Sequence, residues 1–230
     1  MSFVTIPATT IEFVEINKGE NEFPLVWIPG MVDSAVQIIP TLKNSPIHTI
    51  VVSLRGRGNS SSPSKGFSFI NHLNDIDAVV RHLELKAFYI YGHSVGAAYA
   101  AAYASLQYFK IKGLIMGDYL PVYPAFTAQW KKDILHLSNS ALNPQILDEF
   151  LDNNEGFTLA HLLIKLRFPK LIIKAEKESL ISEVQLSALI ESLPNCEVTT
   201  LPGHTHDFLS NPSDDLVSAI KAFIEKSEKI

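Results

Sequence analysis

Residues 87–96 read Ala87-Phe88-Tyr89-Ile90-Tyr91-Gly92-His93-Ser94-Val95-Gly96, and they decide the fold. The first five form a short apolar run with aromatic and β-branched side chains, which is typical of a buried strand. The alanine-rich run at 97–106 predicts a helix, because alanine has the highest helix propensity. Between the two stands G-x-S-x-G, whose glycines allow a sharp turn. We therefore predict a strand, a tight turn and a helix, with the Ser94 hydroxyl raised at the strand's C-terminal edge beside the helix N-terminus.

Strands and helices alternate along the rest of the chain. The hydrophobic patterns predict strands at 10–16, 23–28, 47–54, 111–116, 171–173 and 196–201. They predict helices at 36–42, 69–83, 184–193 and 216–224. Most of these strands are apolar on both faces, as in a sheet that is covered on both sides. The sequence predicts a single α/β domain over residues 1–230, with a mostly parallel central sheet and helices on both faces.

About fifty residues separate the strand that ends near Met116 from the strand that begins near Leu171. Connections of that length are uncommon, and this one contains several aromatic residues, leucines and two stretches with helical character, at 130–137 and 145–151. We expect a small helical cap, inserted at about 119–168 over the C-terminal edge of the sheet. An ordinary crossover helix with long loops is the simpler alternative.

Composition narrows the class of protein. The chain has 230 residues, 47% of them hydrophobic and 19% charged, and a net charge of −5, so nothing points to nucleic acid or to an anionic membrane as a partner. No apolar run approaches the length of ~20 residues that spans a bilayer, and the first residues do not resemble a signal peptide. The single cysteine, Cys196, suits a reducing compartment. We expect a cytoplasmic protein that acts on a small molecule; the oligomeric state is left open.

A serine is a weak nucleophile unless a base lies within hydrogen-bond reach and an acid orients that base. Both groups follow later strands. Glu176 and Glu178 come just after the strand at 171–173, and His204 and His206 come just after the strand at 196–201. Because parallel strands end at the same edge of a sheet, these side chains are candidates to meet Ser94.

The order of these motifs resembles that of the α/β-hydrolase superfamily over nearly the whole length of the chain. The G-H-S-V-G motif matches the nucleophile elbow, and residues 27–31 (Trp-Ile-Pro-Gly-Met) resemble the oxyanion loop, with Pro29 where the family normally has histidine. Residues 53–60 resemble the family's arginine- and glycine-rich loop, 174–182 its acid loop and 201–206 its histidine loop. The resemblance implies that Ser94 is the nucleophile and that the backbone N–H groups of Met31 and Val95 form the oxyanion hole.

The acid has three candidates. The resemblance places it at Glu178, a glutamate where most members have aspartate. Asp118 is the main alternative, because it follows the strand that ends at Met116 and some related lipases carry the acid after that strand. Glu176, two residues before Glu178, is a weaker alternative.

The base has two candidates. His204 directly follows Gly203, as the catalytic histidine often follows glycine in the family. His206 fits the spacing from the strand through Pro202-Gly203 better, and the strand fixes where a side chain emerges above Ser94. We predict His206 as the base, with His204 as the alternative.

The leading function is therefore a serine hydrolase that cleaves a small or medium, fairly apolar acyl compound, most simply a carboxylic ester, through an acyl-enzyme. The expected pocket residues, from the loops beside the elbow and from the cap, are Gly30, His93, Tyr119, Tyr123, Phe126 and Trp130. No cofactor is needed for this chemistry, and His204-x-His206 alone is too little for a metal site. A binding or signalling module with little turnover is the alternative from another class.

Three charged residues outside the triad also have expected roles. Arg55 and Arg57 lie in the arginine- and glycine-rich loop, where arginines more often brace backbone carbonyls than bind an acidic substrate. Asp75 is expected on the exposed face of the helix at 69–83.

Overall fold

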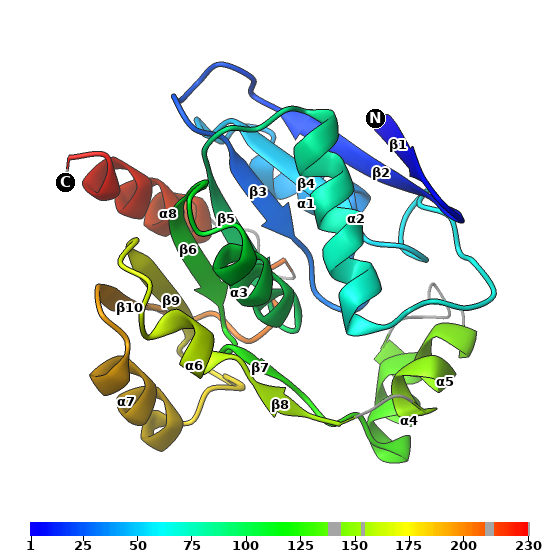
Figure 1. The fold of residues 1–230 in the computed structure, drawn as a ribbon. Helices are drawn as coiled ribbons and strands as arrows, with labels where there is room; N and C mark the ends of the chain where they lie inside the picture. Colours follow the sequence, from blue (N-terminus) through cyan, green and yellow to red (C-terminus); the bar gives the residue numbers. More distant parts are fainter. Residues whose placement is uncertain (138–143, 153–154, 210–213, 230) are drawn as a thin grey trace.

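A mixed sheet of eight strands forms the centre of the computed structural model, which describes residues 1–137, 144–152, 155–209 and 214–229 (Figure 1). The strand order is β1-β2-β4-β3-β5-β6-β9-β10; β2 pairs antiparallel with both of its neighbours, β1 and β4, and the remaining neighbours pair parallel. The strands are β1 Ser2–Ile6, β2 Thr9–Ile16, β3 Leu25–Ile28, β4 Thr49–Ser53, β5 Phe88–His93, β6 Ile111–Gly117, β9 Lys170–Ala175 and β10 Cys196–Leu201.

Helices cover both faces of the sheet (Figure 1). One apolar core contains side chains of α2 Phe69–His82, α3 Gly96–Leu106 and α7 Glu183–Ser192. The other contains side chains of α1 Ala35–Leu42 and α8 Asp214–Ser227. β5 lies between β3 and β6, and all of its six residues are buried, which is why its sequence is apolar on both faces. The predicted α/β class and the mostly parallel sheet are confirmed.

The segment between β6 and β9, residues 118–169, holds the elements that the sequence analysis assigned to a cap. In order they are β7 Val122–Tyr123, α4 Ala128–Leu137, α5 Pro144–Asp152, β8 Phe157–Thr158 and α6 Ala160–Leu163. β7 and β8 pair with each other as a separate two-stranded sheet. In Figure 1, α4 and α5 lie together at one end of the molecule. A role for residues 119–168 as a substrate cap remains a prediction.

The sheet positions the site because the strands β3, β5, β6, β9 and β10 run parallel and end at the same edge. Ile28, His93 and Gly117 are the last residues of three adjacent strands, and the loops that follow them converge there. In the part of the chain that the structure describes, no helix combines the length and apolar character needed to cross a membrane.

Candidate active site

Ser94 occupies the sharp turn between β5 and α3. Its backbone φ is +53°, a conformation that non-glycine residues adopt rarely and that is common at functional sites. Glycines make the turn possible: a Cβ on Gly92 would lie 2.2 Å from the carbonyl oxygen of Gly96, and one on Gly96 would lie 2.4 Å from that of Pro29. The strand, the turn and the helix therefore form as the sequence predicts, with Ser94 at the sheet edge.

His206 links Ser94 to Asp118. Its Nε2 lies 3.1 Å from Ser94 Oγ, and its Nδ1 lies 2.8 Å from Asp118 Oδ2. The three side chains come from the ends of β5, β6 and β10, so the sheet brings together residues up to 112 positions apart. A carboxylate beside Nδ1 places the ring proton on Nδ1 and leaves Nε2 free to accept the Ser94 proton.

Asp118 is fully buried and accepts hydrogen bonds on both carboxylate oxygens. Oδ1 accepts from the Ala175 backbone N–H at 2.8 Å and from Ser179 Oγ at 2.6 Å, and Oδ2 accepts from the Leu180 N–H at 3.2 Å. Burial alone would raise the pKa of Asp118, but these hydrogen bonds and the one from His206 outweigh burial and hold the pKa below its ordinary value. Asp118 therefore stays ionised and faces His206.

This geometry corrects the expectation that Glu178 is the acid. Glu178 is exposed and has a φ of +51°, so the chain turns there and directs Ser179 and Leu180 toward Asp118 instead. Glu176, the weaker alternative, is also exposed and accepts the Gly203 N–H at 2.8 Å. The loop after β9 supports the carboxylate that comes from β6 and does not supply the carboxylate itself.

His204, the alternative base, lies elsewhere. Its ring is buried, and its Nε2 lies 3.3 Å from Asp215 Oδ2 at the start of α8. His204 is thus held toward α8, and the structure brings His206, not His204, to Ser94.

The two expected oxyanion donors are the backbone N–H groups of Val95 and Met31. Val95 follows Ser94 and caps the N-terminus of α3, and Met31 lines the same cavity as Ser94. Neither backbone N–H donates to another residue in the described ranges. Both donors are therefore available to an oxygen atom that sits above Ser94 Oγ.

The His93 ring stacks on the His206 ring, with centroids 5.1 Å apart and an angle of 28° between the planes. Burial, together with the nearby His206, lowers the pKa of His93 to about 3, so His93 is neutral near pH 7. Its other neighbours are Phe208, at a centroid distance of 5.2 Å, and Tyr91, whose hydroxyl lies 3.5 Å from His93 Nδ1. A neutral, immobile ring thus supports the face of His206.

A cavity of about 280 Å³ opens onto Ser94 and His206. Its apolar part comes from Met31, Val32 and, on α4, Ile134. Its other lining residues are Gly30, His93, Asp33 and Asp207. Gly30 and His93 thus lie where the sequence analysis expected pocket residues. Asp33, Asp207 and Ile134 were missed, although Asp207 adjoins His206 and Asp33 follows Gly30 by three residues.

The four aromatic residues expected in the pocket do not line this cavity. Tyr123 packs against Phe69 of α2, with centroids 4.8 Å apart, and Phe126 packs against Trp130 at 4.4 Å. Tyr119 is half-buried against the same core. The reason is local: Tyr123 packs against Phe69 of α2 and Tyr99 of α3, whereas Phe126 packs on Trp130 within its own segment. Tyr123 lines a separate cavity of about 60 Å³.

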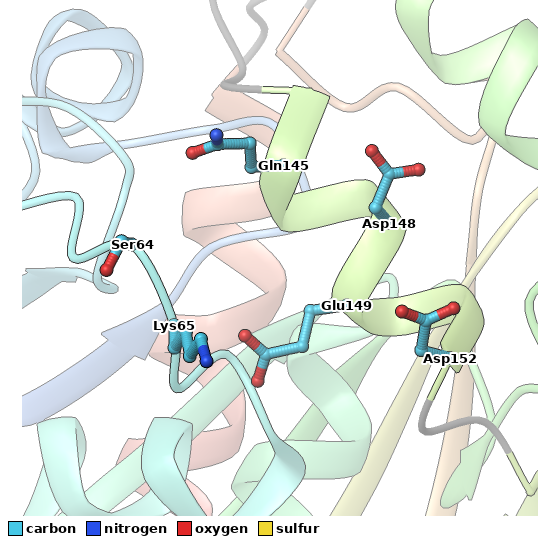
Figure 2. A pocket seen from close by; sticks show the side chains of 6 residues that line it. All are labelled: Ser64, Lys65, Gln145, Asp148, Glu149 and Asp152. Carbon is cyan, nitrogen blue, oxygen red and sulfur yellow. The ribbon is translucent and has the colours of Figure 1, made fainter.

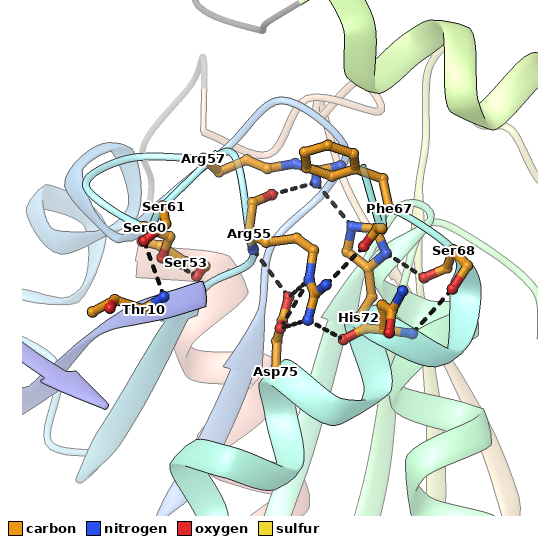
Figure 3. Close-up of polar contacts among 12 residues, drawn as sticks. Thr10, Ser53, Arg55, Arg57, Ser60, Ser61, Phe67, Ser68, His72 and Asp75 are labelled. Atoms are coloured by element: carbon orange, nitrogen blue, oxygen red, sulfur yellow. Dashed lines mark hydrogen bonds and ion pairs between the residues drawn. The ribbon is translucent and has the colours of Figure 1, made fainter. Parts of the chain in front are cut away.

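Arg55, Arg57 and Asp75 form a buried cluster of charged residues (Figure 3). Arg57 donates from Nε to the Met31 carbonyl at 3.0 Å and from Nη1 to the Arg55 carbonyl at 2.7 Å. Arg55 in turn binds Asp75 with an Nη2–Oδ1 distance of 2.6 Å. Both arginines therefore brace backbone carbonyls, as the sequence predicts. The prediction for Asp75 was wrong: this carboxylate is fully buried, because Arg55 lies beside its face of α2.

A second cavity, of about 430 Å³, lies between the loop before α2 and α5 (Figure 2). Ser64, Lys65, Gln145, Asp148, Glu149 and Asp152 line it. Glu149 accepts hydrogen bonds from the backbone N–H groups of Gly66 and Phe67, at 2.8 and 2.6 Å, and so attaches α5 to this loop.

Among the described residues, no group of three or more His, Cys, Asp or Glu side chains is arranged to hold a metal ion.

Comparison with known proteins supports the fold. A family model described as the alpha/beta hydrolase fold matches residues 24–136, which include Ser94 and Asp118. N-formylmaleamate deformylase from Pseudomonas putida is 25% identical and covers 90% of this chain and 90% of its own length.

Solved structures show the same fold. The N-formylmaleamic acid deformylase from Pseudomonas putida S16 superposes with a TM-score of 0.76 at 17% identity, covering 96% of this chain and 99% of that one. An esterase from Rhodococcus sp. ECU1013 gives 0.77 at 17% identity, with 97% of each chain covered. The family match, the shared fold and the similar enzymes lead to one conclusion: this chain has the α/β-hydrolase fold and is a hydrolase.

Proposed function

We propose that this enzyme is a serine hydrolase that cleaves a carboxylic ester with a small or medium, fairly apolar acyl group. The proposal rests on the contacts of the His206 ring, whose Nε2 contacts Ser94 Oγ and whose Nδ1 contacts Asp118. A neutral imidazole held in this way accepts the serine proton as Ser94 attacks a carbonyl carbon.

The reaction proceeds in two halves. As Ser94 Oγ bonds to the carbonyl carbon, its proton moves to His206 Nε2, and Asp118 stabilises the imidazolium that forms. In this proposal the N–H groups of Met31 and Val95 donate to the carbonyl oxygen as it becomes an oxyanion. His206 then protonates the leaving alkoxide, which departs as the alcohol and leaves an acyl-Ser94. Water, deprotonated by His206, hydrolyses the acyl-enzyme and restores Ser94.

The lining of the cavity supports an apolar acyl group. Met31, Val32 and Ile134 form its apolar part, and the volume of about 280 Å³ suits a short or medium chain. The similar deformylase and the similar esterase are both named for acyl-group hydrolysis. The ligand-binding alternative rests on Pro29, which replaces the histidine usual in the oxyanion loop; the contacts of His206 favour an enzyme.

A panel of p-nitrophenyl esters from acetate to octanoate, together with matched thioesters, tests this proposal. We expect turnover that is highest for a short or medium ester and that falls at least about 10³-fold in Ser94→Ala. Folded protein that hydrolyses none of these compounds, while binding one of them, would favour the ligand-binding alternative.

A further inference from the structure

The cavity beside Ser94 contains two carboxylates that the proposed hydrolysis does not use. Asp33 follows the oxyanion loop, and Asp207 follows His206 directly. No lysine or arginine is among the residues that line this cavity. The site that surrounds the nucleophile therefore has a negative electrostatic potential, even though the chain as a whole is only mildly acidic.

Asp33 faces the reacting group at close range. If Gly30 carried a Cβ atom, that atom would lie 3.2 Å from Asp33 Oδ2, 3.5 Å from Ser94 Cβ and 3.6 Å from His93 Cδ2. Gly30 thus leaves open a small space that the carboxylate and the nucleophile's side chain share. Asp33 is half-buried, and it accepts no hydrogen bond from any residue in the described ranges. A half-buried carboxylate that receives no hydrogen bond from these residues takes its donors from water or from a ligand.

The surroundings of Asp33 act on its ionisation. Burial and the charge of Asp207 raise the pKa of Asp33 to about 6, and His206 opposes that rise. The other polar groups near it, the ring of His93 and the hydroxyl of Tyr91, are both uncharged near neutral pH. A cation in the cavity would favour the ionised carboxylate, whereas an anion would have to bind against two negative charges.

We propose that this site selects acyl substrates that carry an ammonium group, and that Asp33 is the specificity-determining residue which holds that group, with Asp207 attracting it from the entrance. The inference rests on the proposed hydrolase function and adds to it the charge of the substrate. The apolar wall of Met31, Val32 and Ile134 holds the uncharged part of the molecule, and the acidic wall holds the cation. Uncharged esters are hydrolysed too, with lower kcat/KM.

Two isosteric esters of one acid test this directly. The choline ester and the 3,3-dimethylbutyl ester of butyric acid differ only in a quaternary nitrogen or carbon atom, so their kcat/KM ratio measures the effect of charge. We expect a choline preference of about tenfold at low salt, the value for a partly screened charge pair. The preference should fall as NaCl is added. It should rise from pH 5 to pH 7 as Asp33 ionises, because any effect of pH that is common to the two substrates cancels in the ratio.

The decisive variant is Asp33→Asn, which keeps the shape and removes the charge. The choline preference should fall to about onefold to threefold, with Asp207→Asn giving a smaller loss. Glu178→Gln is the matched control, because it removes one negative charge from an exposed position outside the cavity and should leave the ratio unchanged. A ratio near one in the wild type, or a ratio that Asp33→Asn does not change, overturns the inference while the hydrolase function stands.

Reactivity of Ser94 separates the two proposals. Phosphonate inhibitors built with the same two alcohols bond to an activated serine without any need for turnover, and their rate constants should show the same preference. If neither inhibitor modifies Ser94 in folded protein, the hydrolase proposal fails and the inference fails with it. If both react at equal rates, only the inference fails.

Discussion

Asp118→Asn is the substitution that the geometry of the site makes most informative. In the wild type, Oδ1 accepts from Ala175 and Ser179, and Oδ2 accepts from Leu180 and His206. An asparagine can keep its carbonyl oxygen at the Oδ1 position. Its NH₂ group then replaces Oδ2 and faces the Leu180 N–H and the His206 Nδ1–H, so that donors face donors. His206 relieves the conflict by moving its ring proton to Nε2, which faces Ser94 Oγ.

A histidine in that tautomer cannot accept the serine proton. The expected loss in kcat is about 10⁴-fold, or about 5 kcal/mol in activation free energy, by analogy with serine proteases in which the same change was made. The unmet Leu180 N–H adds a stability cost of about 1–3 kcal/mol, so circular dichroism and a denaturant titration must first show that the variant is folded.

The assay compares kcat for a p-nitrophenyl ester in wild type, Asp118→Asn and Glu178→Gln. Glu178→Gln should stay within about twofold of wild type, since this side chain is exposed and makes no contact with His206 in the structure. A larger loss of kcat in Glu178→Gln than in Asp118→Asn would show that Glu178, not Asp118, orients His206.

Three further outcomes follow from the same structure. His206→Ala should lose at least about 10³-fold in kcat, while His204→Ala keeps most of the ester hydrolysis, as steady-state kinetics will show. Asp75→Asn leaves the buried Arg55 without its ion-pair partner and should lower the free energy of unfolding by about 3–5 kcal/mol in urea titrations; an exposed Asp75 would give almost no change. Because the pKa of Asp118 is held below its ordinary 3.8, its ionised form stabilises the fold above pH 4, and that contribution is lost as the pH falls through the lowered pKa; the stability difference between wild type and Asp118→Asn should narrow from pH 6 to pH 3.

The sequence was sufficient to predict the fold and the tight turn that holds Ser94, because local patterns determine both. A short apolar run before Gly92 and an alanine-rich run after Gly96 leave little choice but a strand, a turn and a helix. The alternation of such runs predicts the parallel sheet. The missed elements are β1 at the sheet edge and three short ones, β7, β8 and α6, whose pairing depends on contacts distant in sequence.

The acid could not be predicted in the same way, because its position depends on how strands are ordered in space. β6 lies between β5 and β9, so the residue after β6 emerges next to Ser94, while the loop after β9 wraps around that residue. Nothing in the sequence distinguishes a loop that carries the carboxylate from a loop that supports it. The one available signal was that Asp118 directly follows a buried strand, whereas Glu178 stands three residues beyond β9.

Residues with buried charge were hard to predict for a related reason. Asp75 lies in a helix whose apolar positions suggest that aspartates face solvent, and the sequence does not show that Arg55 comes to meet it. The aromatic residues between β6 and β9 were expected to face the substrate. An aromatic side chain packs equally well against a substrate or against other protein side chains. Here Tyr123 packs against α2 and α3, and Phe126 and Trp130 pack against each other.

Reaction of the folded protein with a fluorophosphonate tests whether His206 activates Ser94 as a nucleophile. Intact-mass and peptide analysis of the folded protein should show one covalent adduct, located on Ser94. Labelling should disappear in Ser94→Ala and slow by at least about 10²-fold in His206→Ala. If the folded wild type stays unlabelled, Ser94 is not an activated nucleophile. If His206→Ala is labelled as fast as the wild type, His206 does not activate Ser94.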